Sequence, residues 1–211
     1  MKKTILALLL AACCLSGLAL ADGEDWIPEP YRPILDLARR GAAGDETAMD
    51  DERFNDAYYY LPRESEQTVG WMLMDLDGDS AMELILGLLC EDPGDESFLL
   101  DIWTIRDGEA VLLGRGWERW RMYLTVENGG VYGLYFEGAD SAYDSVFAHS
   151  LIVNGEAVDT ATIHAVFDPE NETAPAEWTL NDAAIGEEEA RALIEGWAAN
   201  AVVLGLSPVQ P

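Results

Sequence analysis

The pattern of apolar and polar positions along the chain predicts a series of β-hairpins in its middle part. Two apolar runs, Val69–Met74 and Leu84–Leu89, are typical of buried strands. Further apolar runs flank three turn sequences, Arg106-Asp107-Gly108-Glu109, Glu127-Asn128-Gly129-Gly130 and Asn154-Gly155. An Asn-Gly pair, present in the last two, favours a type I′ turn between antiparallel strands. We therefore expect residues 69–167 to form a sequential antiparallel sheet.

A period of three to four residues marks one helix at each end of this β-rich region. The segment Pro28–Arg40 is expected to be helical and to end at Gly41. Residues 186–203 are expected to form the second helix, and Glu187, Glu188 and Glu189 lie in its first turn, where the helix dipole favours negative charge. The apolar face of this helix consists of Ala190, Leu193, Ile194, Trp197 and Ala201. The expected fold is α+β, an antiparallel β-hairpin meander flanked by an N-terminal and a C-terminal helix. The last helix should pack on the sheet through Leu193, Ile194 and Trp197.

These elements divide the chain into four segments. Residues 1–21 are expected to be a signal peptide, 22–68 an N-terminal helical and acidic loop segment, 69–205 a β-rich domain with the C-terminal helix, and 206–211 a tail. Within the second segment, residues 41–52 are acidic and rich in small side chains, which is typical of a mobile loop. The sequence ERFNDAYYYLP is expected to add a short helix near Pro62.

The N-terminus has the three parts of a secretion signal. Lys2 and Lys3 precede an apolar run that is too short for a membrane span, and a small-x-small cleavage site ends at Ala21. A second interpretation is open, because Leu10-Ala11-Ala12-Cys13 has the form of a lipobox, in which Cys13 would be lipidated. Both alternatives predict a protein that is secreted or held on the outer face of the cell envelope.

The charge of the chain limits its expected partners. There are 40 acidic and 12 basic residues, a formal charge of −28, and loss of Lys2 and Lys3 with the signal peptide changes this to −30. Such a field repels nucleic acid and anionic membranes and attracts divalent cations. We expect no nucleic-acid partner, and no membrane contact unless Cys13 is lipidated. After cleavage, Cys90 is the only thiol, so no intramolecular disulfide can form.

The most specific signal is the stretch DLDGDSAMELILG, which begins at Asp75. Loop positions 1, 3 and 5 are Asp75, Asp77 and Asp79, position 7 offers the backbone carbonyl of Ala81, and position 9 is Glu83. Hard oxygen ligands at this density suit Ca²⁺, which takes six to eight of them. Without a cation the carboxylates repel one another, by about 1 kcal/mol per pair at ~4 Å in water and about 4 kcal/mol near a protein surface.

This loop resembles the calcium loop of FG-GAP and VCBS-type modules, whose pattern is D-x-D-G-D-x-x-x-E-L. The wider order also resembles secreted or lipoprotein-type bacterial proteins that carry a single copy of the loop. The resemblance implies that Asp75, Asp77, Asp79 and Glu83 are calcium ligands. One position differs, because the family places glycine at position 6 and this chain has Ser80. If that position needs a positive φ, serine costs about 1 kcal/mol relative to glycine.

Other candidate residues have simpler interpretations. Trp117, Trp120 and Tyr123 could stack on sugar rings, although the alternation of Trp120, Met122, Leu124 and Val126 favours a buried strand face. His149 and His164 lie in separate strand segments without metal-ligand spacing, so each is expected to be a structural histidine. Nothing beside Cys90 indicates a nucleophile.

These observations predict a non-enzymatic, secreted or cell-surface interaction module with one structural calcium loop. Its expected partners are the calcium ion and an extracellular protein or glycan. The alternative is a glycan-binding or glycan-hydrolase accessory protein that uses exposed tryptophan and acidic residues; two carboxylates roughly 5 to 9 Å apart in a cleft would favour hydrolysis.

Overall fold

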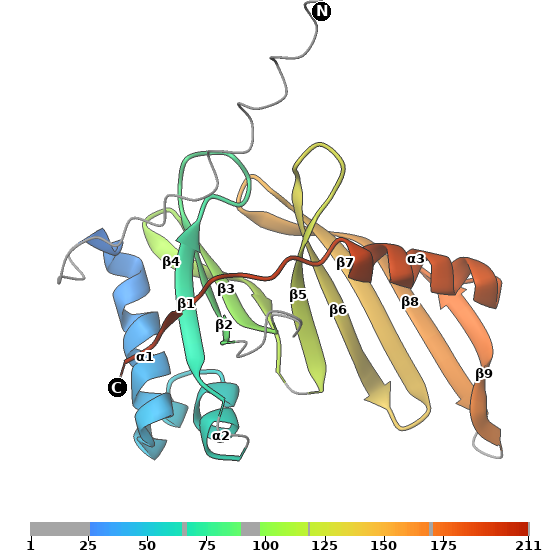
Figure 1. The fold of residues 1–211 in the computed structure, drawn as a ribbon, viewed down its shortest axis with the longest axis horizontal. Helices are drawn as coiled ribbons and strands as arrows, with labels where there is room; N and C mark the ends of the chain where they lie inside the picture. Colours follow the sequence, from blue (N-terminus) through green and yellow to red (C-terminus); the bar gives the residue numbers. More distant parts are fainter. Residues whose placement is uncertain (1–25, 65–66, 90–97, 118, 169–170, 211) are drawn as a thin grey trace, which may run out of the picture.

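The computed structural model describes residues 26–64, 67–89, 98–117, 119–168 and 171–210 (Figure 1). The expected signal peptide, with Cys13 and Ala21, and the lone thiol of Cys90 lie outside these residues. Within the described part, no helix is both long enough and apolar enough to cross a membrane.

One large antiparallel sheet dominates the molecule. Its strands are β1 Val69–Met74, β2 Glu83–Leu88, β3 Leu99–Arg106, β4 Glu109–Arg115, β5 Trp120–Val126, β6 Tyr132–Ser141, β7 Asp144–Val153, β8 Glu156–Asp168, β9 Asn171–Leu180, β10 Ala183–Ala184 and β11 Ser207–Pro208. Neighbouring strands follow the order β10-β9-β8-β7-β6-β5-β3-β2-β1-β11. The expected α+β class is confirmed in its broad form, and the fold is predominantly β.

The strand order departs from a simple meander at β3. One edge of β3 pairs with β2, while its other edge pairs with β4 from Asp101 to Arg106 and with β5 only at Leu99↔Met122. The sheet therefore forks at β3, and β4 branches away from the sequential order (Figure 1). Apolar residues fill separate clusters on the two sides of this fork, one beneath the N-terminal helices and one beneath the C-terminal helix.

The hairpin turns agree in part with the sequence. Asp107 and Gly108 both have positive φ, as do Asn154 and Gly155, which is the geometry of a type I′ turn. The prediction of a type I′ turn at Asn128-Gly129 was wrong, because positive φ occurs at Gly129 and Gly130 and not at Asn128. The second glycine lets this loop close one residue later, with the Glu127 N–H donating to the Val131 carbonyl.

The N-terminal segment packs on the β1–β3 end of the sheet (Figure 1). Its elements are the 3₁₀ helix η2 Glu29–Tyr31, helix α1 Arg32–Ala43, the 3₁₀ helix η3 Glu46–Asp50 and helix α2 Ala57–Glu64. The expected loop over 41–52 is therefore mostly ordered helix and turn. Asp45 explains part of this, because its carboxylate accepts a hydrogen bond from the Thr47 N–H and caps η3.

The prediction that the first helix ends at Gly41 was also wrong. Helix α1 continues to Ala43 and ends at Gly44, whose φ is 94°. Gly41 is buried inside the helix, and a Cβ there would lie 2.8 Å from the ring of Phe54 and 2.9 Å from the Cβ of Tyr58. The glycine serves close packing of α1 against the chain around α2 and is not a terminator.

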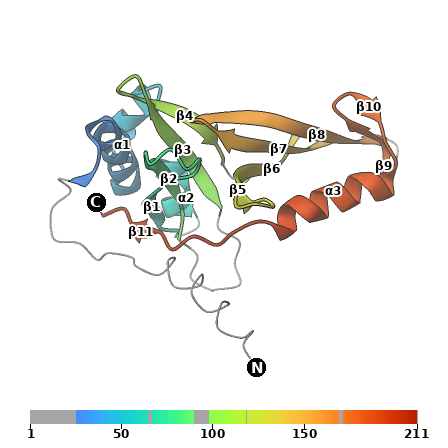
Figure 2. The same ribbon diagram turned by 90° about the horizontal axis from the view of Figure 1, so that it is seen from above.

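Helix α3, Glu187–Ala199, covers one face of the far part of the sheet (Figure 2). Its Ala190 is buried with Ile163, Ala165 and Trp178, and the predicted contacts through Leu193, Ile194 and Trp197 are present. After α3 the chain returns along the sheet, and residues expected to be a tail form β11, which pairs with β1 at Gly70↔Pro208.

Candidate metal-binding sites

The acidic loop connects β1 to β2, and its own carboxylates fold it. Asp75 accepts hydrogen bonds from the N–H groups of Gly78 (2.7 Å) and Ser80 (3.1 Å). Asp77 accepts from the Asp79 N–H at 3.1 Å, and Asp79 accepts from the Ala81 N–H at 2.6 Å. Aspartate at every second position thus closes successive turns, because these short carboxylates accept from backbone N–H groups two to five residues ahead.

Ser80 has a φ of 74°, so position 6 of the loop does adopt the left-handed conformation. This is the region in which a side chain costs about 1 kcal/mol relative to glycine. Gly78, with a φ of 80°, provides a second left-handed residue in the same loop. The chain therefore makes the sharp turn that the resemblance implies, at the serine.

Three of the four expected carboxylate ligands converge. Single oxygen atoms of Asp75, Asp77 and Glu83 all lie within 4.8 Å of one another. Asp79 is not part of this group, because its exposed carboxylate is turned toward the Ala81 N–H. The structure thus brings together positions 1, 3 and 9 of the loop.

Glu83 is the unusual member of the group, because it is 1% exposed. Its Oε2 accepts a hydrogen bond from the Leu76 N–H at 2.8 Å, and its Oε1 accepts from the Thr104 hydroxyl at 3.0 Å. Burial raises the pKa of the Glu83 carboxyl; the two hydrogen bonds oppose this, and the charges of Asp77 and Asp79 reinforce it. A nearby cation would lower the cost of keeping this carboxylate ionised.

Contacts from three other parts of the fold hold the loop. The buried Tyr31 hydroxyl donates to the carbonyl of Met82 at 2.8 Å and lies 3.1 Å from that of Trp103. Burial and the Glu83 charge raise the pKa of Tyr31, so the phenol stays protonated and remains a donor. Asp77 accepts a hydrogen bond from the Gly155 N–H in the β7–β8 turn. These anchors fix the loop relative to η2, β3 and the β7–β8 hairpin.

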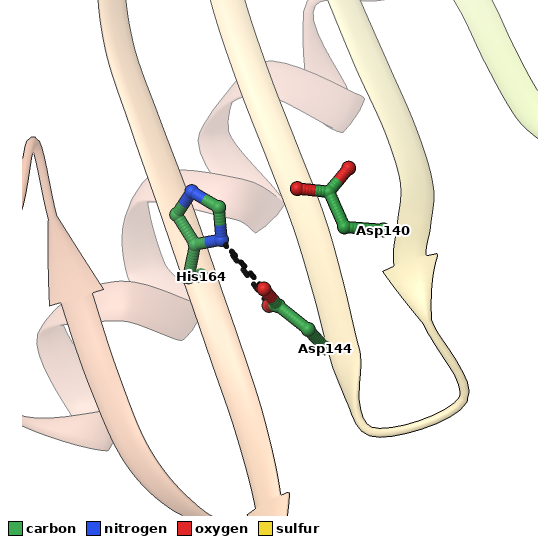
Figure 3. Close-up of side chains that lie close together, drawn as sticks. All are labelled: Asp140, Asp144 and His164. Carbon is green, nitrogen blue, oxygen red and sulfur yellow. Dashed lines mark hydrogen bonds and ion pairs between the residues drawn. The ribbon is translucent and has the colours of Figure 1, made fainter.

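A second group of possible metal ligands lies on the strands β6, β7 and β8. Single ligand atoms of Asp140, Asp144 and His164 lie within 4.8 Å of one another (Figure 3). The His164 Nδ1 is 3.2 Å and 3.1 Å from the two carboxylate oxygens of Asp144. Sequence reasoning placed His164 alone in its strand and missed this group. The available signal was the pair of aspartates flanking the β6–β7 turn, but the register that brings β8 alongside could not be read from it.

The other histidine fits the expected structural role. His149 is buried, its Nδ1 lies 2.7 Å from the Thr160 hydroxyl, and its Nε2 lies 3.1 Å from a carboxylate oxygen of Glu127. Its ring stacks on Trp197 of α3, with centroids 5.4 Å apart and an interplanar angle of 11°. These contacts use the imidazole to join β7 to α3.

The aromatic residues considered for glycan contact separate by exposure. Tyr123 is buried, and Trp120 is half-buried and stacks on Phe136 at 6.0 Å. Trp117 is 49% exposed. Cavities of about 230 and 300 Å³ both include Trp117 in their walls, and the smaller also includes Tyr60, which is 44% exposed. Trp117 is therefore the aromatic residue of this group that is available to a ligand.

Comparison of the chain with models of known protein families, with curated proteins and with solved structures finds no match.

Proposed function

We propose that this protein is a secreted or cell-surface interaction module that binds one calcium ion in the loop from Asp75 to Glu83, and that the ion has a structural and not a catalytic role. The observation that carries the proposal is the convergence of Asp75, Asp77 and Glu83, with ligand atoms within 4.8 Å of one another. All three offer carboxylate oxygens, the ligands that Ca²⁺ prefers. The resemblance of the loop to FG-GAP and VCBS-type modules supports the same ion.

Electrostatics give the ion its stabilising effect. Three carboxylates repel one another in the free loop, and one of them is buried where its charge is poorly solvated. A dication reverses the sign of these interactions. Asp79 and the Ala81 carbonyl, the other two ligands that the loop spacing predicts, lie in the same loop.

The structural role follows from what the ligands contact. Glu83 is bonded to Thr104 of β3, and Asp77 is bonded to Gly155 of the β7–β8 turn. An ion shared by these two side chains links both halves of the forked sheet. The secreted location in this proposal rests on the N-terminal sequence.

Thermal denaturation of the chelator-treated full chain, with and without Ca²⁺, tests this proposal. With an extracellular-type dissociation constant of about 10⁻⁴ to 10⁻³ M, about 1 mM calcium should stabilise the fold by roughly 0.4 to 1.4 kcal/mol. Magnesium at equal ionic strength controls for screening of the net charge, since Mg²⁺ requires a smaller octahedral site.

Two substitutions make the test specific to the loop. Asp77→Ala should abolish the calcium-specific gain in the free energy of unfolding. Glu195→Gln, which removes one exposed charge from α3, should leave this gain unchanged. If calcium and magnesium stabilise the parent protein equally, and Asp77→Ala changes neither response, the loop is an acidic turn and not a calcium site.

A second candidate function is glycan binding at Trp117. The exposed Trp117 and Tyr60 line one cavity together with the carboxylates of Asp56 and Glu64, and such rings and acids suit the apolar faces and hydroxyls of a sugar. Asp56 directly precedes α2 and Glu64 ends it, so about 12 Å of helical rise separates their backbones, more than the carboxylate spacing of glycoside hydrolases. The arrangement favours binding over hydrolysis.

Affinity electrophoresis in polysaccharide gels should show retardation of the parent and its loss in Trp117→Ala, with Leu112→Ala as the exposed apolar control.

A further inference from the structure

We propose that Asp140, Asp144 and His164 form a second metal site, which binds a divalent first-row transition ion such as Zn²⁺. This site is independent of the calcium loop in position and in ligand chemistry. Its three ligands come from three neighbouring strands, β6, β7 and β8 (Figure 3).

The strand register brings the three residues to one face of the sheet. Ile163 and Ala165 are buried against α3, so His164 between them projects from the opposite face. His164 pairs with Val146, two residues from Asp144 on the same face of β7. Figure 3 shows the three side chains in front of the strands and the helix behind them. Antiparallel pairing of β6 with β7 and of β7 with β8 brings the three strands alongside one another, and Asp140 lies at the register shift between Ala139 and Ser141 of β6.

The His164–Asp144 distance already suits a bound ion. Four-coordinate zinc with bonds of about 2.0 to 2.1 Å places its ligand atoms about 3.3 Å apart. The His164 Nδ1 and the nearer oxygen of Asp144 are 3.1 Å apart, already close to this separation. The remaining ligand is Asp140, which is exposed near the end of β6 and can change rotamer without disturbing the core.

Asp140 is also the residue that a simple ion pair does not explain. Its carboxylate has no hydrogen bond or ion pair with any residue that the structure describes, although it lies beside a second carboxylate. In a chain with a formal charge of −28, this placement is repulsive unless a cation is shared. An isolated His164–Asp144 pair would need no third ligand.

The donor set distinguishes this site from the calcium loop. One imidazole nitrogen with two carboxylate oxygens suits zinc and its first-row neighbours, whereas calcium takes oxygen ligands alone. The side chains of His164 and Asp144 are about a quarter exposed, so solvent reaches the site. Three protein ligands in an accessible position leave a coordination position open to water or to a donor from a partner.

Calorimetric titration of the chelator-treated full chain with Zn²⁺ tests the proposal. We expect one ion per chain and a loss of affinity of about 100-fold or more in His164→Ala and in Asp140→Asn. Because Asp140 has no structural partner among the described residues, Asp140→Asn should melt at the same temperature as the parent in chelator. Replacement of zinc by Co²⁺ should give a visible absorption spectrum of the bound ion that both substitutions remove.

The controls separate this site from the acidic loop. Asp77→Ala should retain zinc affinity while losing the calcium response, and His164→Ala should do the reverse, so that either proposal can fail without the other. Unchanged zinc affinity in Asp140→Asn would show that Asp140 is not a ligand and would overturn the proposed three-residue site. Loss of zinc binding in Asp77→Ala alone would also overturn it, because the ion would then occupy the loop.

Discussion

Asp77 accepts a hydrogen bond from the backbone N–H of Gly155, 78 residues further along the chain. The carbonyl of the same glycine accepts a hydrogen bond from Arg106 at 2.8 Å, at the end of β3. The β7–β8 turn is therefore held through both backbone polar groups of one residue, Gly155. The conformation of the acidic loop and that of a distant hairpin are coupled through Asp77.

Removal of the Asp77 carboxylate should loosen that hairpin. A hydrogen bond to a charged group contributes about 1.5 to 3 kcal/mol, so Asp77→Ala should accelerate amide exchange at Gly155 by about tenfold or more. Hydrogen exchange followed by NMR measures this directly. Asp79→Ala is the matched control, because among the described residues the Asp79 carboxylate is bonded within the loop, to the Ala81 N–H. Equal acceleration by both substitutions would contradict a specific coupling.

The calcium response should depend on pH through Glu83. Burial raises the pKa of this carboxyl above the ordinary value of 4.5, so the protonated form is favoured by folding. In chelator, the contribution of Glu83 to stability should therefore fall as pH rises from about 4.5 through the folded-state pKa. Calcium binds the ionised carboxylate, and the calcium-dependent rise in melting temperature should increase over the same interval.

Glu83→Gln separates this effect from the net charge of the protein. The amide keeps one oxygen acceptor for Leu76 or Thr104 but does not titrate. Differential scanning calorimetry at several pH values should show a shallower pH slope in chelator for this variant. A slope identical to that of the parent protein would assign the whole pH dependence to the other acidic residues.

Two glycine substitutions in helices should change the free energy of unfolding in opposite directions. Gly41 lies in α1, and Gly41→Ala places a methyl group 2.8 Å from the Phe54 ring. Overpacking of this kind costs about 1 to 3 kcal/mol. Gly196→Ala in α3 meets no atom within 4 Å, and alanine is the better helix former by up to about 1 kcal/mol. Urea denaturation should show destabilisation by the first and stabilisation by the second. Stabilisation by both would disprove the tight packing of Gly41.

Asp101 should be among the most sensitive polar positions. It is fully buried and accepts hydrogen bonds from Tyr58, from Asn55 at 3.1 Å and from Arg115 at 2.8 Å. These hydrogen bonds connect α2 with β3 and β4. Loss of one partner of such a pair leaves the other charge without compensation. Asp101→Asn should therefore cost about 3 kcal/mol.

The exposed pair of Arg106 and Glu156, 3.4 Å apart, provides the control for Asp101. Glu156→Gln should change the free energy of unfolding by less than about 1 kcal/mol, because water already solvates both charges. Urea denaturation curves measured on both variants check the difference. Similar costs at the two positions would mean that burial of Asp101 adds nothing to its ion pair.

Local signals in the sequence predicted much of the fold. Apolar runs placed β1 and β2 to within a residue, and left-handed turn residues at Asp107-Gly108 and Asn154-Gly155 marked two hairpins. The fork at β3 was not predictable from the sequence. It depends on how β4 and β5 divide the pairing along one edge of β3. Gly41 was misread for a related reason, since its role depends on Phe54 across the helix interface.

The candidate sites show the same limit. Loop spacing was enough to predict that Asp75, Asp77 and Glu83 approach one another, because the turns that join them are local. It was not enough to show that the Asp79 carboxylate turns toward the Ala81 N–H. His164 and Asp144 meet through strand register, a non-local property that depends on a bulge between His149 and Ser150. The exposure of Trp117 beside Tyr60 likewise required the packing of α2 on the sheet.

The short pairing of β11 with β1 has a consequence for self-association. An unpaired outer strand presents N–H and C=O groups that any other extended chain can bond, and charged side chains normally discourage this. Ser207 and Pro208 of β11 pair with the outer edge of β1. The sequence of β1 is VGWMLM, which carries no charge. Release of this final segment would therefore expose a template for polymerisation into fibres. Two residues of the C-terminal segment thus occupy part of the β1 edge to which another chain would otherwise pair.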